Sequence, residues 1–441
     1  TLEYNGYGVT HVMNITDVGH LTDDADAGED KMEKGARREG KTAWDVAEFY
    51  TAAFKQDMRE LNILEPRIWC KATDHIPEQI RLVQTLIDKG YTYTTSDGIY
   101  CDTTKISDYG KLAQLQKQEL KAGVRIDIGE KRNPHDFALW KFTPAGEKRH
   151  MEWPFGFDAQ GKEQMGFPGW HIECSAMSMK YLGEQFDIHC GGIDHVPVHH
   201  TNEIAQSESA TGKIPWVNVW MHGEFLNIQD ENASTAASAT SADRQRKMAK
   251  SEGNFITLQT LKDKGFSPLA YRYFLLQTHY RKQLNFSWEA LEAAQNGYEK
   301  LKNQIADLGD SFKLLPKTIA KYSEDFQKKI NDDLNTPQAL ALIHEVLKDD
   351  SHSQDKWKTI LDFDRILGLG LSSIHRRGKL EYTLQLQNFE ANTPGLLNLL
   401  DKRAAARKEK NWVESDRLRD EIQKSGFSVE DTEEGQRVRK S

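Results

Sequence analysis

The sequence predicts an α/β fold with a parallel sheet at its core, followed by a helical region and a small terminal unit. Three observations support this prediction. Up to about residue 225, helical stretches alternate with apolar, strand-like runs, namely GVTHVMNI, FDIHC and WVNVWM. After about Pro268, apolar residues recur at three- and four-residue spacing, which is typical of packed helices. Near the end of the chain, two helical stretches precede a short strand-and-turn element, SGFSVEDTEEG.

The elements follow in order. Residues 20–41 are polar and predict a solvent-facing loop that leads into a helix. The mixed pattern from about residue 74 to 154 predicts an insertion within the α/β region of residues 1–225. Residues 229–246 form an Ala/Ser/Thr-rich tract, for which we expect a mobile loop that closes over a ligand. Asn335 and Thr336 before Pro337 predict a helix start within a bundle over residues 285–371, and residues 391–441 form the terminal unit.

Composition narrows the classes of function. A chain of 441 residues predicts roughly two to four domains. Its net charge of −9 argues against a sequence-independent DNA coat, although the basic run KRAAARKEK at residues 402–410 suits either an RNA-binding patch or a solvated helix face. The sequence contains no run of about 18 apolar residues, so no membrane span is expected. The four cysteines are too few and too scattered for a disulfide framework: Cys70, Cys101, Cys174 and Cys190.

A metal-ligand set is predicted between residues 169 and 207. His199 and Glu203 are four residues apart in a stretch without Gly or Pro, so a helix would place both on one face. With the thiolate of Cys174 they make a credible zinc set, because thiolate argues against calcium or magnesium. His200 is a candidate supporting or substitute ligand. A buried cysteine near an ordinary polar helix is the alternative interpretation.

Two further patterns suit a nucleotide. Gly191 and Gly192 allow close approach of the backbone, and Asp194 can accept hydrogen bonds from ribose hydroxyls. Lys247 and Lys250, in KMAKS, suit polyphosphate because they offset the charge that grows as a phosphate is attacked. Taken alone, a pair of lysines three apart is usually solvated surface.

These blocks together resemble cysteinyl-tRNA synthetase, a class I aminoacyl-tRNA synthetase family. The resemblance covers nearly the whole chain, and GWHIECSAM and HHTNE are its most specific motifs. The remaining blocks stand in family order: MNITDV, DFALWK, DIHCGGID, KMAKS and HYRKQLNFS. The resemblance implies a Rossmann-like class I catalytic domain with an inserted subdomain, a KMSKS-loop and stem-contact region at residues 226–284, a helical bundle and a C-terminal anticodon-binding domain.

The resemblance also implies a reaction and its site. Cysteine is activated by ATP to cysteinyl-adenylate and transferred to tRNA(Cys), with one Zn2+ on the substrate thiol and Mg2+ accompanying ATP. Thr16, Trp170 and His189 match positions around the cysteine, and zinc discriminates a thiol from an alcohol without editing. The ATP and metal residues are those named above. The implied tRNA contacts are Arg403, Arg407, Trp412, Arg419 and Asp431, with Asp416 matching the same pattern. A monomer in the cytoplasm is expected.

Three departures from the family pattern affect these expectations. The chain opens at Thr1 without the family's HIGH signature and amino-terminal cysteine ligand, so we expect a fragment with weak or no activity by itself. Ala249 replaces the usual serine in KMAKS, which removes a hydroxyl and leaves both charges. Val438 replaces a tryptophan, so an anticodon-stacking platform is lost or supplied elsewhere.

Three alternatives stay open. The first is a cysteine ligase of thiol-cofactor biosynthesis, which should lack the basic terminal unit. The second is a non-catalytic tRNA- or metal-binding relative. The third is a zinc hydrolase, although no general-base carboxylate is placed by a motif such as HExxH.

Overall fold

The computed structural model describes most of the chain and divides it into two compact units. One unit contains residues 2–258 and 280–286, and the other contains Thr1 with residues 259–279 and 287–441. The described residues are 1–19, 31–115, 130–157, 161–229, 245–247, 256–308, 317–373, 393, 395–432 and 435–440.

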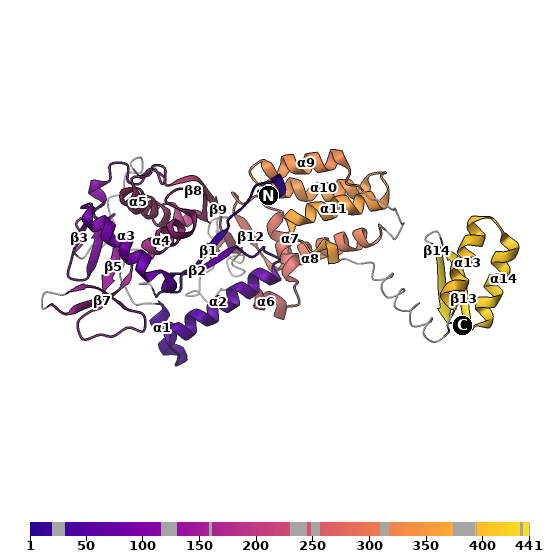
Figure 1. Ribbon diagram of the computed structural model, residues 1–441, viewed down its shortest axis with the longest axis horizontal. Coiled ribbons are helices and arrows are strands. Elements are labelled where there is room, and N and C mark those ends of the chain that lie inside the picture. The colour runs from indigo at the N-terminus through magenta and orange to yellow at the C-terminus, as the bar shows by residue number, and fades with distance from the viewer. Residues whose placement is uncertain are drawn as a thin grey trace, which may run out of the picture. The chain divides into compact units, whose positions relative to one another are not determined.

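The parallel strands predicted for the first unit form two separate pairs (Figure 1). In each pair a helix lies in the connection, as parallel pairing requires. The first pair is β1 (Val12–Ile15) with β2 (Ile68–Lys71), connected through α1 (Lys31–Glu39) and α2 (Ala43–Glu60). The second pair is β8 (Phe186–Gly192) with β9 (Val217–Gly223), connected through a 3-10 helix (Ile193–His195) and α5 (His199–Thr211). Ligands of α/β folds bind beyond the carboxyl ends of such strands.

An antiparallel sheet lies between these pairs in the sequence. Its order is β3-β4-β5-β7-β6, and its strands are β3 (Thr92–Thr94), β4 (Gly98–Cys101), β5 (Phe137–Phe142), β6 (Trp153–Phe157) and β7 (Glu163–Pro168). The sheet reaches past residue 154, where we expected the insertion to end, because β7 pairs with both β5 and β6.

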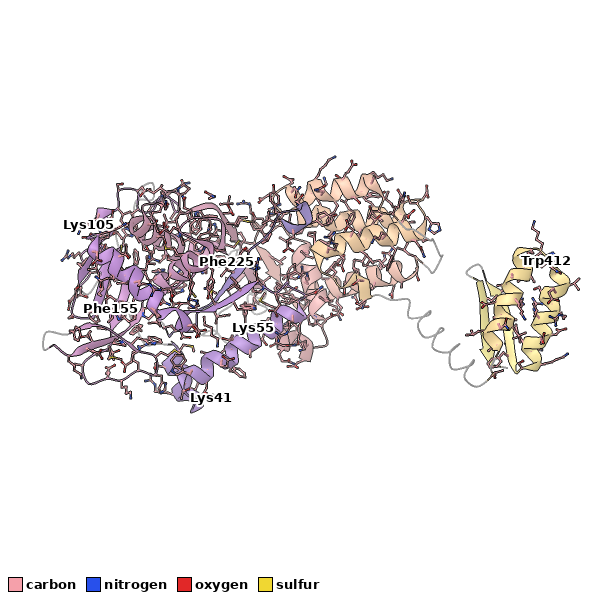
Figure 2. All side chains as sticks on the ribbon, in the orientation of Figure 1. Lys41, Lys55, Lys105, Phe155, Phe225 and Trp412 are labelled. Atoms are coloured by element: carbon pink, nitrogen blue, oxygen red, sulfur yellow. The ribbon has the colours of Figure 1, made fainter. Side chains whose placement is uncertain are left out.

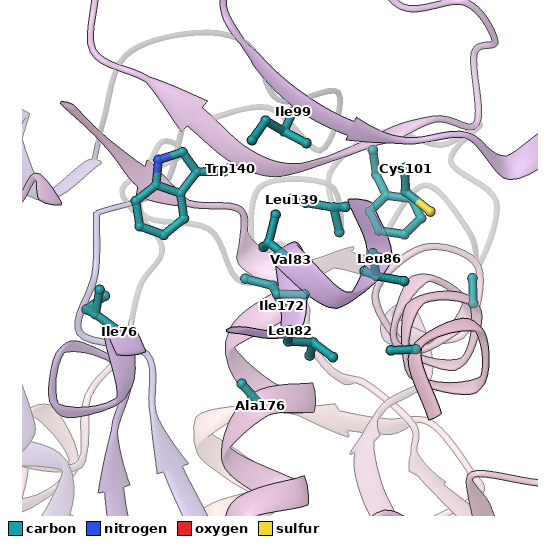
Figure 3. Packing of buried hydrophobic residues seen from close by; sticks show 13 residues of the cluster. Ile76, Leu82, Val83, Leu86, Ile99, Cys101, Leu139, Trp140, Ile172 and Ala176 are labelled. Carbon is teal, nitrogen blue, oxygen red and sulfur yellow. The ribbon is translucent and has the colours of Figure 1, made fainter. Parts of the chain in front are cut away.

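The main hydrophobic core of the first unit joins this sheet to three helices. α3 (Ile76–Asp88) contributes Leu82, Val83 and Leu86 from one face, at the spacing of an amphipathic helix. β5 contributes Leu139 and the fully buried Trp140, and α4 (Trp170–Leu182) contributes Ile172 and Ala176 (Figure 3). Ala205 and Ala210 bring α5 into the same cluster. This packing fixes α4 and α5 against each other, and both carry predicted site residues.

A three-stranded sheet completes the first unit. It has the order β11-β10-β12, with β10 (Leu226–Gln229), β11 (Gln245–Lys247) and β12 (Leu284–Phe286). Other 3-10 turns among the described residues of this unit are Glu3–Asn5, Ala72–His75 and Thr103–Lys105.

The second unit begins as a set of helices. They are α6 (Leu258–Asp263), α7 (Pro268–Leu276), α8 (Trp288–Ala306), α9 (Ala320–Asn331), α10 (Thr336–Lys348) and α11 (Ser353–Leu367), followed by a 3-10 turn, Leu371–Ser373. The predicted helix start at Asn335 is confirmed, because its side chain accepts a hydrogen bond from the Gln338 amide at 3.4 Å. No helix in the described part of the chain is long and apolar enough to cross a membrane.

The terminal segment folds as two helices and a hairpin. The helices are α13 (Leu396–Lys408) and α14 (Trp412–Lys424), and the antiparallel strands are β13 (Phe427–Thr432) and β14 (Gly435–Lys440). Val438 is 2% exposed and belongs to the core of this segment, with Leu396, Leu400, Ile422, Phe427 and Val429. Its side chain is therefore not available as a stacking surface for a base.

Candidate functional site

The predicted metal ligands come together in the first unit. Cys174 lies on α4, whereas His199 and Glu203 lie one turn apart at the start of α5. All three are buried, and their ligand atoms lie within 4.8 Å of one another. His199 Nε2 is 3.8 Å from Glu203 Oε1. The helix predicted from the spacing is present, and the packing of α4 on α5 supplies the third ligand.

Glu203 is a buried carboxylate surrounded by imidazoles. Its side chain is 0% exposed, and neither oxygen accepts a hydrogen bond from a described residue. Burial favours the protonated form, but the neighbouring imidazoles, above all that of His189, outweigh it and hold the pKa of Glu203 below its usual range. A buried charge without hydrogen bonds is costly, which is a reason to expect a cation beside it.

The thiol and imidazole respond to burial in opposite directions. Burial, reinforced by Glu203, raises the pKa of Cys174 well above that of an ordinary thiol. Burial lowers the pKa of His199 well below its usual value, so this ring is neutral and keeps a lone pair for a metal. A cation would reverse the thiol's preference, because metal coordination stabilises thiolate.

Two side chains support these ligands. His171 Nδ1 lies 2.9 Å from His199 Nδ1, so the Nε2 atom of His199 is directed toward Glu203. Metal-binding histidines usually have such a partner on the second nitrogen. Asn14, on β1, donates through Nδ2 to Cys174 Sγ at 3.3 Å and to Thr16 Oγ1 at 3.4 Å. Asn14 therefore connects the predicted cysteine-binding Thr16 to the metal-ligand set.

Trp170 and His189 contact different members of the ligand group. The Trp170 ring, at the start of α4, is 4.3 Å from the ring of His199. His189, on β8, places Nε2 3.2 Å from Glu203 Oε2. Both residues predicted to surround the substrate are thus in contact with the metal-ligand set.

The structure shows a steric requirement for glycine at position 191 that the sequence did not suggest. A Cβ added there would lie 2.5 Å from His200 Cε1 and 2.7 Å from His195 Nδ1. Only glycine leaves room for these two rings at the end of β8. Asp194 is exposed on the following 3-10 turn, and Gly192 passes close to its carboxylate.

The two lysines of KMAKS are described only in part. Lys247 is the last residue of β11, and its backbone pairs with Asn227 of β10. Lys250 lies outside the described residues.

In the terminal segment, Arg403 is held inside the fold. Its side chain is 0% exposed and binds both oxygens of Asp431, at 2.9 and 2.7 Å. Arg407 and Arg419 reach the same carboxylate at 3.0 and 3.4 Å, and hydrogen bonding from Arg403 lowers the pKa of Asp431. Arg403 therefore holds the Asp431 carboxylate in place by two hydrogen bonds, and its buried guanidinium is not accessible to a ligand.

Trp412 places an exposed aromatic side chain on this segment. It is 54% exposed at the start of α14, and the Arg407 guanidinium lies 5.3 Å from its ring (Figure 2). An exposed ring beside a cation can stack with a base, a role that the buried Val438 cannot take.

Several residues of the site were missed from the sequence. Asn14 lay inside the MNITDV block, and His222 inside WMHGE, but neither was singled out. Their signal was weak because their contacts join segments far apart in the chain. The structure adds three histidines to the cluster around Glu203, namely His171, His195 and His222.

Comparisons with known proteins place the chain in a family. Residues 1–296 match the model of the class I (C) tRNA synthetase catalytic domain, 325–371 match the DALR domain, and 392–439 match the cysteinyl-tRNA ligase anticodon binding domain. Cysteine–tRNA ligase 1 of Burkholderia lata is 48% identical over 440 residues, covering 99% of this chain and 85% of the relative. Cysteine–tRNA ligase of Treponema denticola is 44% identical and covers 98% and 87%.

One solved structure supports the fold alone. Mycobacterium tuberculosis methionyl-tRNA synthetase bound by methionyl-adenylate has a TM-score of 0.54 at 14% identity, covering 84% of this chain and 86% of that chain. The family models and the two curated relatives carry the stronger argument, since they span nearly the whole chain. On these matches, the chain belongs to the cysteinyl-tRNA synthetase family.

Proposed function

We propose that this protein is a cysteine–tRNA ligase, which activates L-cysteine with ATP to cysteinyl-adenylate and transfers the cysteinyl group to tRNA(Cys). Curated relatives with this name match it over almost its whole length. The observation that carries the amino-acid specificity is the buried group of Cys174, His199 and Glu203, whose ligand atoms lie within 4.8 Å of one another.

The ligand group fits Zn2+. It combines a sulfur, an imidazole and a carboxylate, and the Glu203 oxygens lack hydrogen bonds from described residues. Bound Zn2+ would supply a thiol-preferring Lewis acid. The surrounding side chains orient the ligands and shield them from solvent. His171 directs the ring of His199, Asn14 donates a hydrogen bond to Cys174, and the Trp170 ring packs on His199.

ATP binding is proposed for the end of β8 and for the KMAKS segment. Asp194 is exposed there and suits the ribose hydroxyls of ATP, with Gly191 and Gly192 forming the adjoining backbone. Lys247 and Lys250 would neutralise the phosphates, together with Mg2+. The proposal includes one bound Zn2+, Mg2+ that accompanies ATP, a monomeric state and a cytoplasmic location.

The terminal segment favours tRNA over the other cysteine-ligase alternative. It matches an anticodon-binding model, and it presents Trp412 beside Arg407. The partly exposed side chains of Arg407 and Arg419 both lie beside Asp431, so two basic groups are fixed at one place on this segment. A ligase that does not use tRNA has no need for such a segment.

The Cys174→Ser substitution tests the proposal, with Cys190→Ser as the matched control. Cys190 is exposed on β8 and is not a member of the group of Cys174, His199 and Glu203. We expect Cys174→Ser to lower zinc content and to erode the preference for cysteine over serine, because it removes the sulfur ligand. Elemental analysis measures the zinc content, and competition between cysteine and serine for binding to the chain measures the preference. Equal zinc content in both variants would refute the ligand assignment.

A further inference from the structure

Glu203 faces two different groups of side chains with its two oxygens. Oε1 lies on the side of His199, at 3.8 Å from Nε2. Oε2 lies 3.2 Å from His189 Nε2 and 3.9 Å from His200 Nε2. The ligand atoms of His189, His200 and Glu203 all lie within 4.8 Å of one another. One buried carboxylate therefore borders a second set of potential ligands, which contains no sulfur.

The spacing of this second set suits a small dication. Ligands at 2.0–2.1 Å from a tetrahedral zinc ion are about 3.4 Å apart. The 3.2 and 3.9 Å separations from Glu203 Oε2 bracket that value. Every pair of ligand atoms in the set lies within 4.8 Å, so the three side chains face one common point.

The orientation of His200 favours coordination through Nε2. Its Nδ1 lies 2.8 Å from Nε2 of His222, and β9 fixes His222 opposite Gly191 of β8. With Nδ1–H donating to His222, the Nε2 lone pair of His200 faces Glu203.

We infer that His189, His200 and Glu203 form a second metal site, which binds a zinc-like divalent ion and shares Glu203 with the site of Cys174 and His199. Two imidazoles and one carboxylate prefer Zn2+, Co2+ or Ni2+ over Mg2+ or Ca2+. The inference rests on the proposed zinc site only through the shared carboxylate, which would bridge the two ions. The second ion would lie beside His189, a proposed cysteine-binding residue, so an excess of metal would act on the substrate pocket.

Stepwise addition of Co2+ to the metal-free full chain tests this inference. Thiolate bound to Co2+ gives an intense charge-transfer band in the near ultraviolet, whereas a site of nitrogen and oxygen ligands does not. We expect two equivalents of bound Co2+ by equilibrium dialysis, of which one produces the band. Cys174→Ser should lose the band and keep one equivalent. His200→Gln should keep the band and lose one equivalent, and His189→Gln should repeat that result.

The control is His344→Gln on α10, outside the cluster, which should bind Co2+ like the parent chain. Far-ultraviolet circular dichroism checks that each variant is folded. A parent chain that binds a single equivalent with the band would overturn the second site, as would a second equivalent that survives both histidine substitutions. Absence of the band from the parent chain would instead count against the proposed Cys174 site, so the two failures are distinguishable.

Discussion

At the scale of single residues, two arginines of the terminal segment form ion pairs in different surroundings. Arg403 is 0% exposed and binds Asp431 with two hydrogen bonds. The side chain of Arg417 is 58% exposed and pairs with Glu414 and Glu421 along α14. Exposed pairs contribute little to stability because solvent screens them and both side chains lose entropy. Removal of one partner from a buried, hydrogen-bonded pair is much more costly.

We therefore expect Arg403→Met to destabilise the terminal segment by roughly 1.5–3 kcal/mol, the range for a hydrogen bond to a charged group. Arg407 and Arg419 stay near Asp431 and limit the loss. The matched Arg417→Met should leave the stability of the segment close to that of the parent, because solvent screens its exposed ion pairs. Hydrogen exchange of the β13 and β14 amides measures both. Equal protection in the two variants would contradict the buried role of Arg403.

Asp431 gives this hairpin a pH dependence with a definite sign. The pKa of Asp431 is lowered in the folded state, first by the hydrogen bonds from Arg403. Its contribution is complete above the unfolded pKa of about 3.9 and is lost as pH falls through the lowered folded pKa. We expect hairpin amide protection, corrected for intrinsic exchange, to fall below about pH 4. Asp431→Asn should flatten this part of the profile.

At the scale of elements, α2 begins with a capping box. Thr42 Oγ1 accepts a hydrogen bond from the Asp45 amide at 3.1 Å, and Asp45 Oδ2 accepts one from the Thr42 amide at 3.1 Å. These bonds satisfy amides that a helix leaves without partners, and the hydrogen bonds from Thr42 lower the pKa of Asp45.

We expect Thr42→Ala to destabilise the first unit by about 1 kcal/mol, because the helix loses its side-chain cap. Thr42→Ser is the matched control, since it keeps the hydroxyl and should stay close to the parent. Urea unfolding, followed by circular dichroism, measures both variants. A serine variant as unstable as the alanine variant would show that the methyl group, and not the cap, is responsible.

At the scale of the whole molecule, amino-acid activation and tRNA binding are assigned to different segments of the chain. The metal and nucleotide residues belong to the first unit, whereas the exposed Trp412 belongs to the terminal segment of the second. A substitution at Trp412 should therefore affect only the reaction that contains tRNA.

We expect Trp412→Ala to weaken tRNA binding by roughly 1–3 kcal/mol, the range for one base stacked on an aromatic ring. Binding of L-cysteine to the zinc-loaded chain without tRNA should not change. Val413→Ala, at a position that is 84% exposed, is the neighbouring control and should leave both measurements close to the parent. A loss of cysteine binding for Trp412→Ala alone would contradict the separation of the two roles.

The sequence by itself determined the family and the fold class, and it predicted the residues that we propose as metal ligands. Its strongest signals were local, because the stretch that forms α5 contains no Gly or Pro before its end, and four-residue spacing on a helix places His199 and Glu203 on one face. The structure confirms that these residues meet Cys174. Family-specific motifs carried the rest of that prediction.

Only the tertiary structure decided which side chains surround that group and which residues are hidden. The hydrogen bond from Asn14 to Cys174 joins residues 160 positions apart, and His200 meets His222 across two segments. The burial of Arg403 and Val438 likewise depends on how the hairpin packs on α13 and α14. Such contacts leave no periodic pattern, since they arise from packing between elements and not from the conformation of any one of them.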